Sequence, residues 1–273
     1  MLTAAVAGHV FASPSSSQIL SALRRCASSR HGSLVIVKNY TGDVINFGRA
    51  IERARWEGLA KDFKMVVVAD DVGVVTNQKL TNNDTNEVSD VGRRGLAGTV
   101  LVHKVAGAAA ALGGSLEEVY RAAQTVTQNI ATIGVALSTC TVPGSTVETR
   151  QMGSKEVEFG LGIHGEPGFE IKKLESSQKT VQQMLDKILN SPEMRLKLGA
   201  RPSSYSAVLL VNNLGGTTSL ELYTTARDAL LYLRDRHVHV LKTYAGTLMT
   251  SLDMHGISLT LLAVPPGRER QML

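Results

Sequence analysis

Three short runs of β-branched and aliphatic residues constrain the fold of this chain more than any other feature. They occupy residues 34–37, 65–68 and 205–211, and each run ends in a polar or glycine-containing segment. Such runs are typical of strands buried in a parallel sheet. Residues with helical spacing follow the first run over 44–54 and the last over 218–234. This alternation of strand and helix predicts an α/β fold.

The length of 273 residues allows one large domain or two of ordinary size. The helical pattern that starts at the capping box Ser115-Leu116-Glu117-Glu118 should end near Gly134. Val142-Pro143-Gly144-Ser145 then interrupts the regular pattern, so we place the passage between domains there. We therefore expect two α/β domains, at residues 1–143 and 144–273.

A glycine-rich stretch from Glu158 to Gly168 reads Glu-Phe-Gly-Leu-Gly-Ile-His-Gly-Glu-Pro-Gly. Its glycines and proline exclude a helix and predict a loop that lets a ligand approach the main chain. His164 stands in this loop without bulky neighbours. An unperturbed imidazole is largely neutral at cellular pH, so such a ring could act as a base, a metal ligand or a nucleophile. The alternative is a histidine that only hydrogen-bonds a tight turn.

A polar cluster, Lys38-Asn39-Tyr40-Thr41-Gly42-Asp43, lies between the end of the first apolar run and the start of the helical pattern. In open α/β sheets, ligands bind in the crevice at the carboxyl ends of the strands. Lys38 and Asp43 are therefore candidates for ligand contact. The alternative is that Thr41 or Asp43 only caps the helix.

Composition excludes several classes of protein. The net charge of +5 could suggest nucleic acid, but the basic residues are scattered and only 4% of residues are aromatic, too few for base-stacking platforms. No apolar run approaches the roughly 20 residues that span a bilayer, and the first ten residues do not read as a secretory signal. The two cysteines show no pairing pattern. We expect a cytoplasmic protein that binds neither nucleic acid nor membrane.

Four segments in order resemble the dihydroxyacetone kinase K-domain family, the substrate-binding half of dihydroxyacetone and triokinase-type kinases. They are the run from Met1 to Pro14, Lys38 to Asp43, Gly92 to Thr99, and Gly160 to Gly168. The resemblance implies two α/β domains of the K-domain type. It also implies an enzyme of glycerol and triose catabolism, a phosphotransferase that makes dihydroxyacetone phosphate.

The resemblance also implies roles for four residues. His164 would attack the carbonyl carbon of dihydroxyacetone and hold it as a covalent hemiaminal. Lys38 and Asp43 would hydrogen-bond the triose hydroxyls, with Asp43 as the base that takes the proton of the attacking hydroxyl. Ser13 matches a serine whose backbone lines the triose pocket, or it is an ordinary turn serine before Pro14.

In the family, the run that begins here at Met1 follows a glycine-rich segment with a further active-site histidine. We therefore expect the first domain to be incomplete at its N-terminus. ATP and Mg²⁺ would bind a separate L domain or subunit rather than this chain, for which we expect no cofactor or metal site. The family implies a homodimer. The alternative function is a catalytically incomplete K domain that binds ligand or regulates a partner.

Other polar groups carry weaker signals. Asp70 and Asp71 follow an apolar run, but consecutive strand residues point to opposite faces, so we interpret them as turn and cap residues. The pair Arg93-Arg94 could contact phosphate, although neither the pattern nor the family assigns it that role. His103 is expected to be structural or exposed. Gly215-Gly216 could form a phosphate-binding turn, and His237 and His239 would share one face of a strand as surface histidines.

Overall fold

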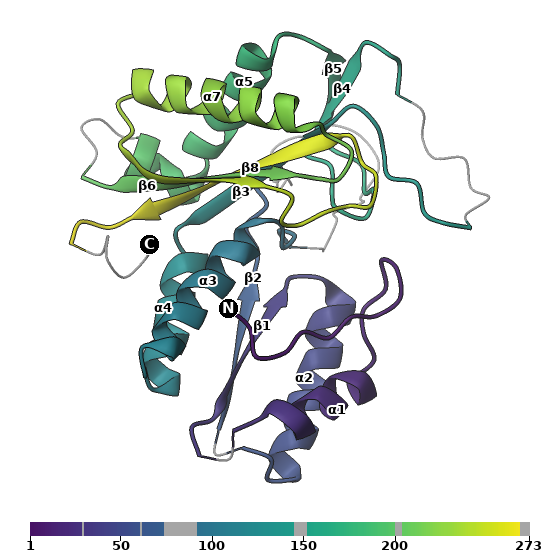
Figure 1. The fold of residues 1–273 in the computed structure, drawn as a ribbon, viewed down its shortest axis with the longest axis vertical. Helices are drawn as coiled ribbons and strands as arrows, with labels where there is room; N and C mark the ends of the chain where they lie inside the picture. Colours follow the sequence, from purple (N-terminus) through teal and green to yellow (C-terminus); the bar gives the residue numbers. More distant parts are fainter. Residues whose placement is uncertain (29, 61, 74–91, 145–151, 200–203, 268–273) are drawn as a thin grey trace, which may run out of the picture.

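The computed structural model describes residues 1–28, 30–60, 62–73, 92–144, 152–199 and 204–267. The segment at residues 76–90, whose many Asn, Thr and Asp residues predict an exposed loop, lies outside these ranges. The fold is mixed α/β, as predicted, with a two-stranded and a six-stranded sheet. Figure 1 shows helices α3 and α4 between the two sheets and further helices on their outer sides.

The smaller sheet pairs β1 (Ser33–Lys38) in parallel with β2 (Phe63–Val68). One face of this sheet packs against α1 (Ser16–Cys26) and α2 (Thr41–Trp56). The other face packs against α3 (Gly98–Ala111) and α4 (Leu116–Thr127). Side chains alternate accordingly, since Val35 joins the first cluster while Leu34 and Ile36 join the second.

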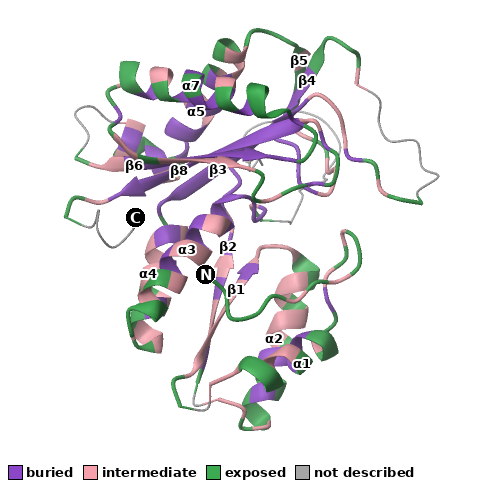
Figure 2. Ribbon diagram, in the orientation of Figure 1, coloured by how far each residue is buried: buried purple, intermediate pink, exposed green. Residues whose placement is uncertain are grey.

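The larger sheet has the strand order β5-β4-β3-β8-β6-β7. Its strands are β3 (Ile130–Ala136), β4 (Glu156–Phe159), β5 (Glu170–Lys173), β6 (Ser206–Asn213), β7 (Val240–Gly246) and β8 (Gly256–Val264). Its helices are α5 (Ser177–Leu189), α6 (Pro192–Met194), the π-helical turn Arg195–Gly199 and α7 (Ser219–Asp235). Helices α5 and α7 cover one face, and α3 and α4 cover the other. The central strands are accordingly buried (Figure 2).

The two sheets meet where β2 ends. Asp71 forms an isolated parallel bridge with Thr132 of β3. The Thr132 N–H donates to the Asp70 carbonyl at 2.7 Å, and the Val72 N–H donates to the Thr132 carbonyl at 2.8 Å. Strand β3 precedes the expected passage at residue 143 but lies in the larger sheet, which therefore combines both halves of the sequence. The division at residue 143 stays a prediction.

Two local predictions were wrong. The helix that starts at the Ser115 capping box, which is present, ends at Thr127 rather than near Gly134. Gly134 lies inside β3, where the run is fully buried on both faces. Strand β7 begins at Val240, so His237 and His239 precede it, and His237 has a left-handed backbone with φ of 57°.

No helix in the described part of the chain combines the length and apolar character needed to cross a bilayer.

Candidate active site

His164 lies in the loop after β4, between two aromatic rings from distant segments. The Tyr40 ring packs edge-on against the imidazole with centroids 4.7 Å apart. The Phe11 ring packs from the N-terminal segment at 5.1 Å. The imidazole is 26% exposed. The loop therefore presents the ring partly to solvent and fixes its orientation through two aromatic neighbours.

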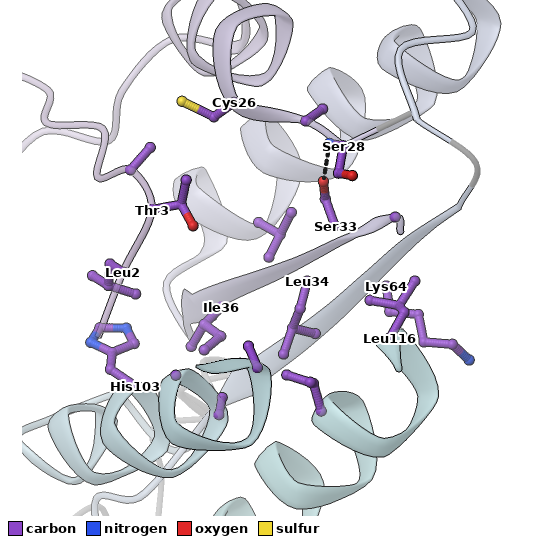
Figure 3. A pocket seen from close by; sticks show the side chains of 18 of the residues that line it. Leu2, Thr3, Cys26, Ser28, Ser33, Leu34, Ile36, Lys64, His103 and Leu116 are labelled. Atoms are coloured by element: carbon purple, nitrogen blue, oxygen red, sulfur yellow. Dashed lines mark hydrogen bonds between the residues drawn. The ribbon is translucent and has the colours of Figure 1, made fainter. Parts of the chain in front are cut away.

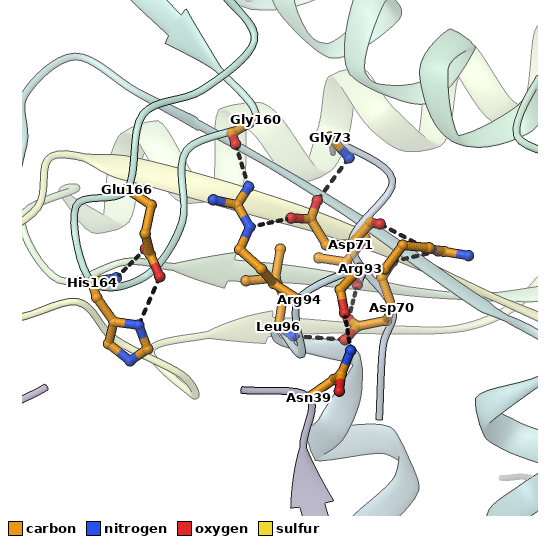
Figure 4. Close-up of polar contacts among 11 residues, drawn as sticks. Asn39, Asp70, Asp71, Gly73, Arg93, Arg94, Leu96, Gly160, His164 and Glu166 are labelled. Atoms are coloured by element: carbon orange, nitrogen blue, oxygen red, sulfur yellow. Dashed lines mark hydrogen bonds and ion pairs between the residues drawn. The ribbon is translucent and has the colours of Figure 1, made fainter. Parts of the chain in front are cut away.

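Glu166 orients the imidazole by hydrogen bonding, as Figure 4 shows. Its Oε1 lies 2.9 Å from His164 Nδ1, and its Oε2 accepts the His164 backbone N–H at 2.9 Å. Burial by itself raises the pKa of Glu166, but the hydrogen bonds from His164 and the backbone prevail and lower it to about 2. Glu166 is thus an anion that favours a proton on Nδ1. No hydrogen bond joins Nε2 to any residue that the structure describes.

A buried arginine supports the same loop from behind. Arg94 Nε donates to Asp71 Oδ2 at 2.7 Å, and Nη2 donates to the Gly160 carbonyl at 2.6 Å (Figure 4). Gly160 has a φ of +78°, a conformation that favours glycine. Ser251 donates to the carbonyl of Ile163, which adds a second anchor. The backbone on the N-terminal side of His164 is therefore fixed at two carbonyl groups.

Ser13, Lys38 and Asp43 lie on the first-half side of the site. Ser13 Oγ donates to Asp43 Oδ2 at 2.7 Å, which joins the N-terminal segment to the first turn of α2. Lys38 Nζ lies 5.7 Å from the centroid of the Tyr40 ring, so Tyr40 contacts both Lys38 and His164. Burial lowers the pKa of Lys38, and the nearby carboxylates of Asp43, Asp70 and Glu166 offset this only in part. Lys38 therefore lies within the electrostatic influence of both Asp43 and Glu166 of the His164 loop.

A cavity of about 1580 Å³ opens beside the smaller sheet (Figure 3). Lys38 and Asp43 line one part of it, together with His103. Much of its wall is apolar and comes from β1, α1 and α3. His103, for which a structural or surface role was predicted, is half-buried and faces this cavity, where burial lowers its pKa.

The structure brings all four predicted site residues together. Their side chains come from residues 11–13, 38–43 and 164–166 and are linked through the Tyr40 ring and the Ser13–Asp43 hydrogen bond. The alternative that Thr41 or Asp43 caps α2 was wrong, because the N-cap is Tyr40 and it has no side-chain cap bond.

The weaker signals resolve into structural roles. Asp70 accepts the Gly98 N–H at 2.8 Å from outside α3, whose N-cap residue Ala97 makes no side-chain cap bond. Asp71 accepts the Gly73 N–H two residues on, as a turn residue does, and pairs with Arg94. Arg93 pairs with Glu193. The N–H groups of the Gly215-Gly216 turn donate to protein acceptors, so they are not free for a phosphate.

Sequence reasoning missed Glu166, Tyr40, Phe11 and Arg94. Glu166 stands only two positions after His164, a spacing that allows one carboxylate to reach both the ring and the backbone N–H. That spacing was a usable signal. The contacts of Phe11 and Arg94 join residues far apart in the chain, and no local pattern marks them.

The comparison with known families decides the classification. The Dak1 domain matches residues 1–272. This chain belongs to the Dak1 domain family. The Dak1 assignment confirms the resemblance to the K domains of dihydroxyacetone kinases drawn from the four sequence segments.

Among similar Dak1 proteins, the triokinase/FMN cyclase of Homo sapiens is 44% identical over 265 residues, covering 97% of this chain and 43% of that protein. The dihydroxyacetone-binding subunit of PTS-dependent dihydroxyacetone kinase 1 from Listeria innocua is 42% identical over 275 residues, covering 100% and 77%. The chain spans less than half the length of the triokinase/FMN cyclases it matches.

Two solved structures support the Dak1 fold. The dihydroxyacetone kinase of C. freundii in complex with AMP-PNP and Mg²⁺ superposes with a TM-score of 0.80 at 35% identity, covering 96% of this chain and 44% of that one. A dihydroxyacetone kinase operon co-activator superposes with a TM-score of 0.81 at 35% identity, covering 95% and 74%.

Proposed function

We propose that this chain is the substrate-binding K domain of a dihydroxyacetone kinase and holds the triose covalently through His164. The observation that carries the proposal is the imidazole itself. Glu166 engages Nδ1, whereas Nε2 has no hydrogen-bond partner among the described residues and the ring is partly open. An imidazole held in this way directs one nucleophilic lone pair outward.

In the proposed step, His164 Nε2 attacks the carbonyl carbon of dihydroxyacetone. A C–N bond forms, the C=O π pair moves to oxygen, and that oxygen takes a proton from solvent. The ring becomes an imidazolium as the bond forms, and the Glu166 carboxylate stabilises this charge; loss of the Nδ1 proton to solvent then gives the neutral hemiaminal. We propose that the two hydroxymethyl arms of this adduct then face Lys38 and Asp43.

In the phosphoryl transfer that follows, Lys38 and Asp43 act on the triose hydroxyl that attacks phosphorus. Asp43 accepts its proton, and the Lys38 ammonium, which no hydrogen bond or ion pair engages in the described ranges, binds substrate oxygen and offsets developing negative charge. Ser13 keeps the Asp43 carboxylate oriented through its 2.7 Å hydrogen bond. ATP and Mg²⁺, bound to a separate L domain or subunit, supply the phosphoryl group that gives dihydroxyacetone phosphate.

We also infer a homodimer that works in the cytoplasm, together with this L-domain partner. The name of the Listeria relative, a dihydroxyacetone-binding subunit, supports a division of substrate and donor between chains. The free cysteines Cys26 and Cys140 are consistent with a reducing compartment.

A second candidate function is a ligand-binding regulator without turnover. The similarity to a dihydroxyacetone kinase operon co-activator supports it. Both candidates share triose capture by His164, and they differ only in whether Asp43 then works as a base.

The test uses dihydroxyacetone labelled with ¹³C at the carbonyl. NMR of the chain with this ligand is expected to show protein-bound label in an sp³ environment, distinct from the hydrate of the free sugar, and His164→Asn is expected to abolish that bound signal. His255→Asn is the matched control, because His255 also pairs with a glutamate, Glu221, but lies elsewhere. A labelled carbonyl that stays sp² with the unaltered chain overturns the proposal.

Turnover separates the two candidates. With ATP, Mg²⁺ and an L-domain protein, the kinase proposal requires dihydroxyacetone phosphate. Asp43→Asn is then expected to keep the adduct and to lower turnover by about 10²- to 10⁴-fold, the usual contribution of a general base. An adduct without any product under these conditions favours the regulator.

A further inference from the structure

We propose that Arg94 is a positioning residue for His164, which sets the loop geometry and the tautomer of the imidazole that captures the triose. This inference rests on the proposed function for its chemistry. The contacts of Arg94 are with the loop backbone at Gly160 and Gly162 and not with Nε2.

Arg94 has a place in the fold that few arginines occupy. It is 7% exposed, and its ion-pair partner Asp71 is fully buried. Asp71 also accepts the Gly73 N–H at 2.7 Å and lies at the bridge that joins the two sheets. The guanidinium therefore starts from a fixed anchor, because moving it would leave a buried carboxylate without its partner.

From this anchor Arg94 reaches the His164 loop at two points. Nη2 donates to the Gly160 carbonyl at 2.6 Å. Nη1 lies against Gly162, where an added Cβ would be 2.7 Å from Nη1 and 2.0 Å from Glu166 Oε2. The positive guanidinium and the Glu166 carboxylate thus flank the same glycine. Arg94 fixes the backbone before His164 and places a positive charge beside the carboxylate that holds Nδ1.

Arg94 thus links the buried Asp71 to the Gly160 carbonyl and lies beside Gly162, the glycine against which the Glu166 carboxylate also packs. Groups behind a functional histidine select which ring nitrogen carries the proton. With Arg94 in place, the loop backbone holds Glu166 where it accepts from Nδ1–H, so the lone pair is on Nε2. Without it, the Gly160 carbonyl loses this hydrogen bond and Gly162 loses the guanidinium that packs beside it and Glu166. We then expect the imidazole to sample both tautomers.

The adjacent Arg93 provides a matched control. Its guanidinium donates to the backbone carbonyls of Asp70 and Asp71 and pairs with Glu193 on α6. It is the same residue type one position earlier and contacts the same strand end, but no described contact joins it to the His164 loop. If triose capture weakens in the Arg94 variants but not in Arg93→Lys, the cause lies in the His164 loop rather than in the end of β2.

Two Arg94 variants make the test. Arg94→Lys keeps a charge for Asp71 but cannot donate to Asp71 and the Gly160 carbonyl in the same fork geometry. Arg94→Met combined with Asp71→Asn removes both charges of the buried pair together, which avoids an unpaired buried carboxylate. Arg93→Lys is made alongside. Circular dichroism and thermal melts establish that each variant is folded.

The first readout needs no ligand. The ¹⁵N spectrum of the His164 ring is expected to show the Nδ1–H tautomer in the unaltered chain and in Arg93→Lys. Both Arg94 variants are expected to show a mixture. The second readout is the association constant for the dihydroxyacetone adduct, expected to fall by about 10- to 100-fold in the Arg94 variants, the range typical when a group behind a functional histidine is lost.

Three outcomes overturn the proposal. One is a folded Arg94→Lys whose tautomer and adduct constant match the unaltered chain. Another is an equal loss in Arg93→Lys, which would indicate general loosening of the strand end. The third is a loss of adduct with the tautomer unchanged. If the unaltered chain forms no adduct, the proposed function fails instead, and the ligand-free ¹⁵N spectra still decide the role of Arg94.

Discussion

At the scale of single residues, the site depends on one carboxylate with two tasks. Glu166 accepts one hydrogen bond from the Nδ1–H of the His164 ring and another from the His164 backbone N–H. The same side chain therefore sets both the loop conformation and the ring orientation. Gly162 has to be glycine for this arrangement, because a Cβ would collide with the Glu166 carboxylate. The glycines of this loop were predicted to let a ligand approach the main chain. At Gly162, glycine is also needed because the Glu166 carboxylate packs against it.

Acid titration should reveal this carboxylate. The pKa of Glu166 is lowered to about 2 in the folded chain from an ordinary value of 4.5, so its contribution to stability is complete above 4.5. It is lost as the pH falls toward 2. We expect the unfolding free energy of the unaltered chain to exceed that of Glu166→Gln near pH 6 and the two to converge near pH 2. Chemical denaturation at a series of pH values measures this. A pH-independent difference would contradict it.

The sequence predicts a site residue when its role depends on a short motif, and not when it depends on contacts between residues far apart in the chain. Lys38, Asp43, Ser13 and His164 were identified because they stand in short motifs. Glu166 stands in the same motif as His164 and was open to prediction. Arg94 was not, because its role depends on the fold bringing residues 71 and 160 to the same point.

At the scale of elements, β1 belongs to a two-stranded sheet, and no other strand in the described part of the chain pairs with its second edge. The Ser33 and Asn39 N–H groups donate toward β2 at 2.9 and 2.8 Å. Because donors alternate along a strand, the N–H groups of Leu34, Ile36 and Lys38 point the other way, into the cavity beside β1. The strand is thus protected on one side only.

Hydrogen exchange should show this alternation. We expect the amides of Leu34, Ile36 and Lys38 to exchange at least about tenfold faster than those of Val35 and Val37, a difference of about 1.4 kcal/mol in opening free energy. Exchange followed residue by residue by NMR measures it. Uniform protection along β1 would show instead that another backbone segment covers this edge.

The predicted elements were correct where a run had a clear period and a marked start. The capping box at Ser115 begins α4 as predicted, and the helix expected over residues 218–234 is α7, which begins directly after the N-cap Thr218. The prediction failed at β3, because a strand buried on both faces has no alternation and its residues continued the helical spacing of α4. An apolar run after a helix cannot be distinguished from that helix by period alone.

At the scale of the whole molecule, one buried polar cluster joins the two sheets. Asp70 accepts hydrogen bonds from Leu96, Gly98 and Thr132, while Asp71 bridges to β3 and pairs with Arg94. Burial raises the pKa of both carboxylates, and these partners oppose that effect. Directional polar contacts therefore join the two sheets, and the loss of one partner should weaken this junction.

Removing one member of this cluster should destabilise the whole molecule. Asp71→Ala leaves Arg94 buried without its partner, and we expect a loss of about 3–5 kcal/mol in unfolding free energy. Asp235→Ala removes a carboxylate from an exposed pair with Arg234 and should change little. Urea unfolding followed by circular dichroism compares the two. A similar, small effect of both substitutions would mean that the buried pair does not hold the sheets together.

The site draws on residues 11–13, 38–43 and 164–166, which come together only once both sheets have formed and docked. A triose that contacts all three segments would bind the native chain and not its unfolded forms, so it would raise the melting temperature and resistance to proteolysis in proportion to its concentration. In a cell, supply of the sugar would then govern how much of the protein survives as well as how much of it is occupied.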